Sequence, residues 1–441
     1  MRPRAAGILI AAAAVVLATH LGSALAPRPA PDPALPPAAA LTDPSGIAHA
    51  SIDTIDRSIG AWTQNLIANP RDFLAATNLA VLYHGRGRLS GDLADTDRAL
   101  EAAATALHIA PGHAPARAAE AAIRFTLHDF VGARGVAEAL VRDDPTQLGA
   151  LATLADAKLE LGRLAGARAD YERLAAATGG PAVDVRLARL AYVSGDPDGA
   201  VAHARAAYDA AARAGASDAS FYAYALGEYA RLTGDVVVAR GGFEAALATR
   251  PDDLGALVGL ARIDAFDGRL DAAIAGLRRA AAIAPQPETL ALLGDLLAGR
   301  GDEAGARLQY DTVRLTSELS ALAGAVYDRQ LSLFALDHGG ATEAILASAR
   351  AALDVRADAG GHDLVAWAAY RLGRLDEARR ASESALATGT RDARILFHAG
   401  AIARAAGDAD RGRELLREAI ALGPALDPLE RAEAERLLAA H

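Results

Sequence analysis

Apolar residues recur along this chain with the spacing of amphipathic α-helices, in segments rich in alanine and leucine. Strand-like patterning is absent apart from the short run Val236–Val238, which lies inside a helical segment. Single glycines separate one Ala/Leu-rich segment from the next. The pattern therefore predicts helices along most of the chain, joined in pairs by glycine-containing turns.

The glycines of these turns recur at a nearly constant interval. Successive intervals are 33, 39, 34, 33, 38, 34 and 34 residues, so the base period is 34. The two long intervals exceed it by about one helical turn. A fixed period of this size is typical of repeat proteins. The turn glycines are Gly162, Gly195, Gly234, Gly268, Gly301, Gly339, Gly373 and Gly407.

The residues around each glycine repeat the same chemistry. Leucine stands eight residues before the glycine, as at Leu226, and alanine or glycine comes next. A large side chain fills the space between helices while a small one lets backbones approach, so this pair predicts a close helix crossing in each repeat. Alanine follows five residues after the glycine, as at Ala239 and Ala344, and an aromatic residue or leucine follows nine after it, as at Phe243.

The ends of the second helices carry their own signals. Proline, which cannot continue a helix, stands seventeen residues after the glycine at Pro251, Pro285 and Pro424. Aspartate often follows the glycine directly, where its side chain caps the next helix and suits the helix dipole. This aspartate is found at Asp196, Asp235, Asp302 and Asp408.

This order of residues at a 34-residue pitch resembles the tetratricopeptide repeat (TPR) family. The segments Tyr224–Pro251 and Leu257–Pro285 carry nearly every signature position in register. The resemblance covers about ten repeats over residues 71–424 and implies an all-α fold, a right-handed superhelical solenoid of antiparallel helix pairs. Another two-helix repeat family with a slightly different period is the alternative.

The first two repeats depart from the pattern, and a single helix is predicted at each end of the repeat array. The first repeat has its glycine at Gly87 and about seven extra residues in the turn that follows, within 88–97; the second has His128 where the glycine would be. Residues 45–70 predict a single N-terminal capping helix, and residues 425–441 predict a C-terminal one.

The N-terminus carries a targeting signal. Arg2 and Arg4 precede the apolar run Ile8–Ala18, and Ala24–Ala26 offers a small-x-small cleavage site. Residues 1–26 are therefore predicted to be a signal peptide, or alternatively a membrane anchor formed by residues 5–26, and the proline-rich residues 27–44 a linker. The expected location is exported, either periplasmic or extracellular, or else held at a membrane by that anchor.

Composition narrows the chemistry. The chain has 52% hydrophobic but only 5% aromatic residues, and its net charge of −10 argues against nucleic acid as a partner. The absence of cysteine excludes disulfides and thiolate sites, and the single lysine, Lys158, excludes a phosphate loop of the G-x-x-x-x-G-K-[ST] type. The histidines show no metal-ligand spacing. We expect no enzyme activity, no cofactor and no metal.

The remaining function is binding. A TPR solenoid offers a concave groove lined by the first helix of each pair, so the resemblance implies a protein or extended peptide partner there. The first hypothesis is an exported scaffold for such a partner. The alternative is a structural component of a polysaccharide synthesis or export complex, or of a secretion complex. The predicted contact residues are Arg186, Arg189, Tyr192, Tyr224, Glu228, Arg231, Arg262, Phe266, Asp295, Trp367, Tyr370 and Arg404.

Overall fold

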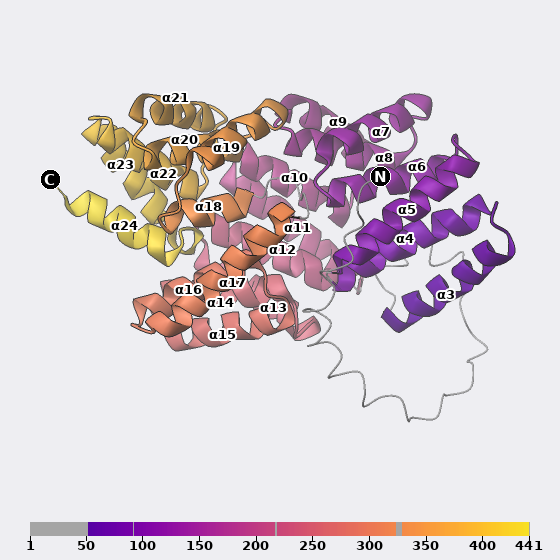
Figure 1. Ribbon diagram of the computed structural model, residues 1–441, viewed down its shortest axis with the longest axis horizontal. Helices are drawn as coiled ribbons and strands as arrows, with labels where there is room; N and C mark the ends of the chain where they lie inside the picture. Colours follow the sequence, from indigo (N-terminus) through magenta and orange to yellow (C-terminus); the bar gives the residue numbers. More distant parts are fainter. Residues whose placement is uncertain (1–51, 91, 217, 323–328, 441) are drawn as a thin grey trace.

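The computed structural model describes residues 52–440 apart from 91, 217 and 323–328 (Figure 1). The predicted signal peptide or anchor at 1–26 and the linker at 27–44 lie outside the described residues. Within these residues every regular element is helical, which confirms the predicted all-α class. None of the described helices combines the length and the apolar character that crossing a membrane requires.

The helices follow one another through short turns, with a 3₁₀ turn, η2, before the last. In chain order they are α3 (Ile52–Ala68), α4 (Phe73–Ser90), α5 (Leu93–Ile109), α6 (Ala114–Thr126), α7 (Phe130–Asp143), α8 (Leu148–Glu160), α9 (Leu164–Ala177), α10 (Pro181–Val193), α11 (Pro197–Arg213), α12 (Ala219–Leu232), α13 (Val236–Thr249), α14 (Leu254–Phe266), α15 (Leu270–Ile283), α16 (Pro287–Gly299), α17 (Glu303–Leu322), α18 (Arg329–Asp337), α19 (Glu343–Val355), α20 (Ala359–Arg371), α21 (Leu375–Leu386), α22 (Ala393–Ala405), α23 (Ala409–Ala421), η2 (Gly423–Ala425) and α24 (Pro428–Ala439).

Helix pairs are the unit of packing. Most even-numbered helices pack chiefly against the odd-numbered helix that follows them, as α12 does against α13, and the predicted solenoid of helix pairs is confirmed. The even-numbered helices also contact one another, for example α10 with α12 and α20 with α22. They are the first helices of the pairs, so their neighbouring faces form the inner row of the solenoid.

The core repeats the large-and-small pairing that the sequence predicts. Phe243 on α13 is fully buried between Gly227 on α12 and Gly259 on α14. A Cβ atom on either glycine would collide with the phenylalanine ring, so the three helices approach this closely only with glycine there. The small residue predicted for each repeat is buried at Ala155, Ala188, Gly227, Ala261, Gly294, Ala366 and Gly400.

The turns between paired helices behave as their chemistry requires. All eight turn glycines have positive φ, and His128, which replaces the glycine, has φ +61°. The aspartates after the glycines cap the next helix: Asp235, for example, accepts a hydrogen bond of 3.0 Å from the amide of Val238. Local sequence therefore fixes both sides of each turn.

One sequence prediction about a turn was wrong, and one repeat departs from the others at its alanine position. Residues 88–97 do not enlarge a turn, because α4 continues to Ser90 and α5 begins at Leu93, capped by Asp92. Helix extension satisfies the backbone hydrogen bonds that a loop would leave to solvent. Ala344 is exposed, and Leu346 takes the buried position instead. The cause is a turn two residues longer: α19 begins four residues after Gly339, whereas α13 begins two after Gly234.

The solenoid winds back onto itself. Figure 1 shows the C-terminal helices, from α19 to α24, lying beside the magenta helices of the middle of the chain. η2 contacts α12 and α14, and α24 contacts α16. We call the helices α8 to α15 the first winding, the helices α19 to α24 the second winding, and the line of contacts between them the seam.

Candidate interaction site between two windings

Backbone passes against backbone along the seam. A Cβ atom on Gly162 would lie 2.5 Å from the carbonyl oxygen of Ala357, and one on Gly195 would overlap the carbonyl oxygen of Gly389. These are two of the turn glycines of the first winding, and their partners lie in the segments that precede α20 and α22. By contrast, a Cβ atom on Gly268, Gly301, Gly339, Gly373 or Gly407 would meet nothing within 4 Å.

Polar contacts continue the seam beyond the glycines. The Tyr192 hydroxyl donates to Asp392 at 2.8 Å, and Arg231 donates to the carbonyl of Pro424 at 2.8 Å. Arg356 forms an ion pair with Glu160. These three pairs join residues 200, 193 and 196 positions apart. The nearly constant separation means that successive repeats of one winding meet successive repeats of the other.

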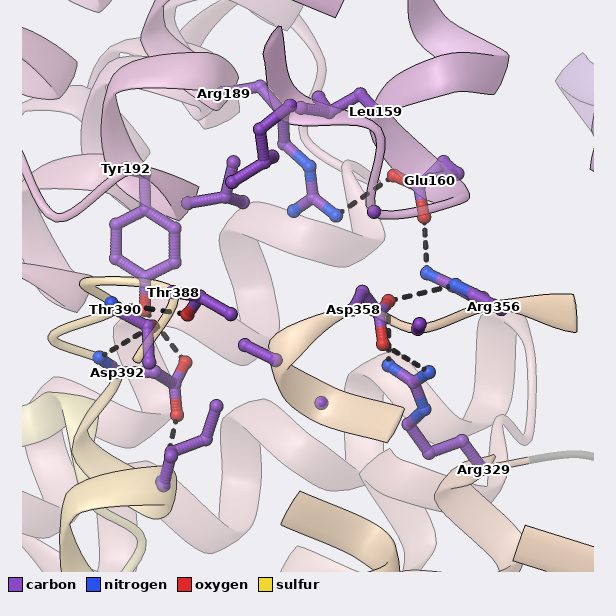
Figure 2. Close-up of a pocket in the computed structure, with 17 residues that line it drawn as sticks. Leu159, Glu160, Arg189, Tyr192, Arg329, Arg356, Asp358, Thr388, Thr390 and Asp392 are labelled. Carbon is purple, nitrogen blue, oxygen red and sulfur yellow. Dashed lines mark hydrogen bonds and ion pairs between the residues drawn. The ribbon is translucent and has the colours of Figure 1, made fainter. Parts of the chain in front are cut away.

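The first cavity of the seam lies between the turn after α8 and the segment before α20. It has a volume of about 190 Å³ (Figure 2). Glu160 lies between Arg189, at 3.0 Å, and Arg356, while Asp358 accepts a hydrogen bond from Arg329 at 2.8 Å and forms an ion pair with Arg356 at 2.9 Å. The positive and negative groups alternate, so the charges around the cavity are balanced, and apolar side chains such as Leu159 and Ile395 line the rest of the wall.

A second cavity of about 170 Å³ lies between α14, α16, α18 and the start of α24. Arg262 pairs with Asp427, and Arg394 pairs with Glu430 at 2.5 Å and Asp427 at 3.4 Å. Burial and the nearby charge of Arg231 lower the pKa of Arg262 to about 10, which leaves it cationic at neutral pH. This cavity, like the first, is lined by charged side chains together with apolar ones, here Leu292, Leu333 and Phe334.

Besides Arg262, four predicted contact residues lie at the two cavities or on α10. Arg186 donates to Asp156 at 3.0 Å, and Arg189 and Tyr192 line the first cavity. Burial and the Asp392 carboxylate raise the pKa of Tyr192 well above its ordinary value, so its hydroxyl stays a donor. Asp295 lines the second cavity, where it accepts from Tyr310 at 2.8 Å.

On α12 and α14, the predicted residues contact the second winding, one another or the core of the first winding. Arg231 is only 5% exposed and also donates to Glu228 through two nitrogens, at 2.6 and 2.9 Å. Phe266 lies under the guanidinium of Arg431, at 5.0 Å. Tyr224 is partly buried, with its ring 6.1 Å from that of Phe243. These positions on the first helices are therefore already engaged within the chain.

The last three predicted residues lie on the second winding. Trp367 is 3% exposed; its indole donates to Asp337 at 2.8 Å and stacks on His398, with ring centroids 4.0 Å apart. Tyr370 stacks on Trp367, and Arg404 donates to the carbonyl of Ala440 at 2.7 Å. Whether any of the twelve residues binds a partner is a prediction still to be tested.

Sequence reasoning missed the partners of these residues. Glu160, Arg356, Asp392 and Asp427 lie at a helix end or in the segments between pairs, outside the positions that the repeat pattern singles out, whereas Pro424 occupies the proline position of that pattern. A charged or proline residue in a connecting segment ordinarily means solvent exposure or a helix cap. No signal in the sequence distinguishes those that meet the other winding. Among the described residues no group of three or more His, Asp or Glu side chains is placed to hold a metal ion.

The likeness of this chain to known proteins is found among solved structures. No family model matches the sequence, and no curated protein matches it. Among solved structures, the chain is similar to the crystal structure of PilW, described as a widely conserved type IV pilus biogenesis factor. The identity is 17%, the TM-score is 0.40, and the match covers 50% of this chain and 97% of that chain. At these values the likeness carries no argument about partner or role, and TPR membership stays a resemblance.

Proposed function

We propose that this protein is a non-catalytic scaffold that holds a protein or an extended peptide against the first helices of its helix pairs. The observation that carries the proposal is the polar character of the seam. Arg189, Arg231 and Arg262 extend from the first helices to carboxylates or carbonyls, some of them on the second winding. A partner that offers the same groups can take over these contacts.

The energetics support exchange at this surface. Interfaces within one chain that are polar resemble transient protein–protein interfaces, in which few contacts are individually strong. Contacts between ions lose Coulomb energy when they separate but regain hydration, so the net cost of opening is small. Arginine is also enriched among the residues that dominate binding energy at interfaces.

The proposed setting is the cell envelope or the exterior of the cell. It rests on the predicted targeting signal in residues 1–26. N-terminal sequencing of the protein purified from its native cells tests this setting, with a mature chain beginning near Pro27 as the expected result. A chain that retains residues 1–26 in the cytoplasmic fraction would contradict it.

Site-specific photo-crosslinking tests the scaffold proposal. A photoreactive benzoylphenylalanine in place of Arg189, at the rim of the first cavity, is expected to form a covalent adduct with one defined partner in native cells. The matched control carries the same group in place of Glu244, an exposed residue on α13. Identical adducts at both positions, or none at position 189, would remove the scaffold proposal.

A further inference from the structure

The residues between α23 and α24 do not simply connect these helices. Residues Leu422–Asp427, with the sequence LGPALD, lie across the C-terminal ends of α12 and α14, helices of the first winding. We call this the 422–427 segment. Its Gly423, Pro424 and Leu426 are buried.

The 422–427 segment contacts the first winding with main chain and side chain in turn. The carbonyl oxygen of Pro424 accepts from buried Arg231 at 2.8 Å, and the Asp427 carboxylate pairs with Arg262. Gly423 lies beside the ring of Phe266: a Cβ atom there would be 3.5 Å from it. These are the kinds of contact by which a helical groove binds a peptide: a carbonyl, a carboxylate and an apolar contact.

The contacted residues are those that sequence reasoning assigned to a partner. Arg231, Arg262 and Phe266 were predicted to face the groove, and Glu228 holds the guanidinium of Arg231 in place at 2.6 Å. All four belong to α12 and α14, the first helices of two successive pairs. The 422–427 segment therefore covers a surface whose chemistry suits a ligand from outside.

Charge specifies what would replace this segment. The surface on α12 and α14 contributes Arg231 and Arg262 against one carboxylate, Glu228, and Asp427 supplies the balancing negative charge. Removing Asp427 leaves a net positive charge, because Arg231, Arg262 and Arg394 then face only Glu228 and Glu430. A carboxylate at the same place restores the balance, whereas a basic group meets repulsion.

The segment is held by contacts that lie on its own side of the seam. Arg431 on α24 donates to the carbonyls of Ile420 and Gly423, both at 2.9 Å, and covers the face of Phe266. Asp427 and Glu430 form the capping box that starts α24. Attachment to the chain gives the segment an effective concentration on the order of millimolar, so it competes strongly with any free ligand.

We propose that the 422–427 segment is an internal ligand, and that the partner binds in its place on α12 and α14. The partner presents an acidic peptide with a turn like that of η2, which places a backbone carbonyl at Arg231 and, three residues further on, a carboxylate at Arg262. The inference rests on the proposed scaffold function and names the chemistry of its partner. Binding requires the segment to leave, so the free protein is closed and the bound protein is open along this part of the seam.

A peptide copied from the segment is the probe. Fluorescein-labelled peptide with the sequence of residues 420–431, IALGPALDPLER, is titrated into the full chain and followed by fluorescence anisotropy. The released variant carries Asp427→Asn and Arg431→Ala. These changes remove the ion pair of Asp427 with Arg262 and the contacts of Arg431 with the 422–427 segment and Phe266, but they leave α12 and α14 unchanged. Because only the open fraction binds, the released variant is expected to bind the peptide at least about tenfold more tightly than the wild-type chain.

Two matched controls make the result specific. Adding Arg262→Gln to the released variant, or using a peptide with asparagine at the place of Asp427, is expected to weaken binding at least about tenfold. Circular dichroism establishes that the variants keep their helices. Equal binding by the wild-type chain, the released variant and the Arg262→Gln variant overturns the proposal, as does binding by none of them.

A second experiment measures the opening of the seam in a chain whose 422–427 segment is unmodified. The chain has no cysteine, so Val237→Cys on α13 and Glu414→Cys on α23 provide the only two thiols for a pair of spin labels. Saturating peptide is expected to lengthen the distance between the labels, and an unchanged distance distribution counts against the proposal. If a specific photo-adduct forms at position 189 but the peptide does not bind, the scaffold proposal stands. Only the proposal that the 422–427 segment is an internal ligand is then contradicted.

Discussion

Gly195 and Gly389 lie so close together that no side chain fits between them, although they belong to different windings of the solenoid. A Cβ atom on Gly195 would overlap the carbonyl oxygen of Gly389. Both glycines have positive φ, +77° and +83°. The turn conformation already requires glycine at position 195, and the same missing Cβ lets the second winding pack there. One residue thus serves both the local turn and the long-range seam.

Gly195→Ala is therefore expected to destabilise the protein more than alanine in an equivalent turn. Positive φ alone costs an alanine about 1–2 kcal/mol, and overpacking against the backbone of Gly389 adds about 1–3 kcal/mol. Gly373→Ala is the control, because its φ is +74° and a Cβ there meets nothing within 4 Å. Urea unfolding measures both. Equal losses in the two variants would show that the seam contributes nothing at this point.

Phe243→Ala is expected to lower the free energy of unfolding by about 3–5 kcal/mol. The ring is fully buried between Gly227 and Gly259, whose missing side chains leave no atoms able to fill the cavity. Phe221, which is 47% exposed, is the matched control, and Phe221→Ala is expected to cost under about 1 kcal/mol. Thermal melts followed by circular dichroism compare the two, and similar losses would contradict the proposed core of each repeat.

The Arg356–Glu160 pair is expected to couple energetically across the seam. Both side chains are largely covered, 27% and 15% exposed, so a double-mutant cycle with Arg356→Gln and Glu160→Gln is expected to give about 1–2 kcal/mol. The exposed pair Arg379–Glu383 on α21 is the control, with at most about 0.5 kcal/mol. A seam coupling no larger than that of the control would mean that the windings separate freely.

Stability is expected to fall as the pH rises above about 6.5, through the folded-state pKa of His398. This histidine is fully buried and its Nδ1 lies 3.0 Å from both oxygens of Asp363 on α20. Burial alone lowers its pKa, but the charge and hydrogen bond of Asp363, with Asp337 on α18 and Glu430 on α24, raise it above the ordinary value.

The raised pKa of His398 makes the stability fall as the pH rises. Because the folded protein holds the proton more tightly than the unfolded chain, the stabilisation is complete below pH 6.5 and is lost as the pH passes the raised value. Urea unfolding between pH 5 and pH 9 measures it, with Asp363→Asn as the control in which this part of the slope disappears. A slope that is the same in both proteins would assign the pH dependence to other groups.

Much of the fold is encoded locally and can therefore be predicted from the sequence. The turn glycines, the capping aspartates and the Leu-small pairs act within a few residues or between adjacent helices, so a fixed period reveals them without knowledge of the whole molecule. His128 adopts the positive φ of the glycine it replaces, which the period alone indicated. The prediction for 88–97 was wrong because α4 extends further than the pattern indicates, and Ala344 is exposed because the turn before α19 is two residues longer. Such helix ends depend on small differences in local free energy.

The sequence by itself determined the helix pairs, their pitch and which face of each first helix carries Arg231, Arg262 and Tyr192. Only the tertiary structure decided what those side chains touch. Contacts such as Tyr192–Asp392 join residues 200 positions apart, and they depend on small rotations between helix pairs that add up over several repeats. The total rotation cannot be predicted from a residue pattern, because the rotation between each two helix pairs is set by the packing of many side chains at once.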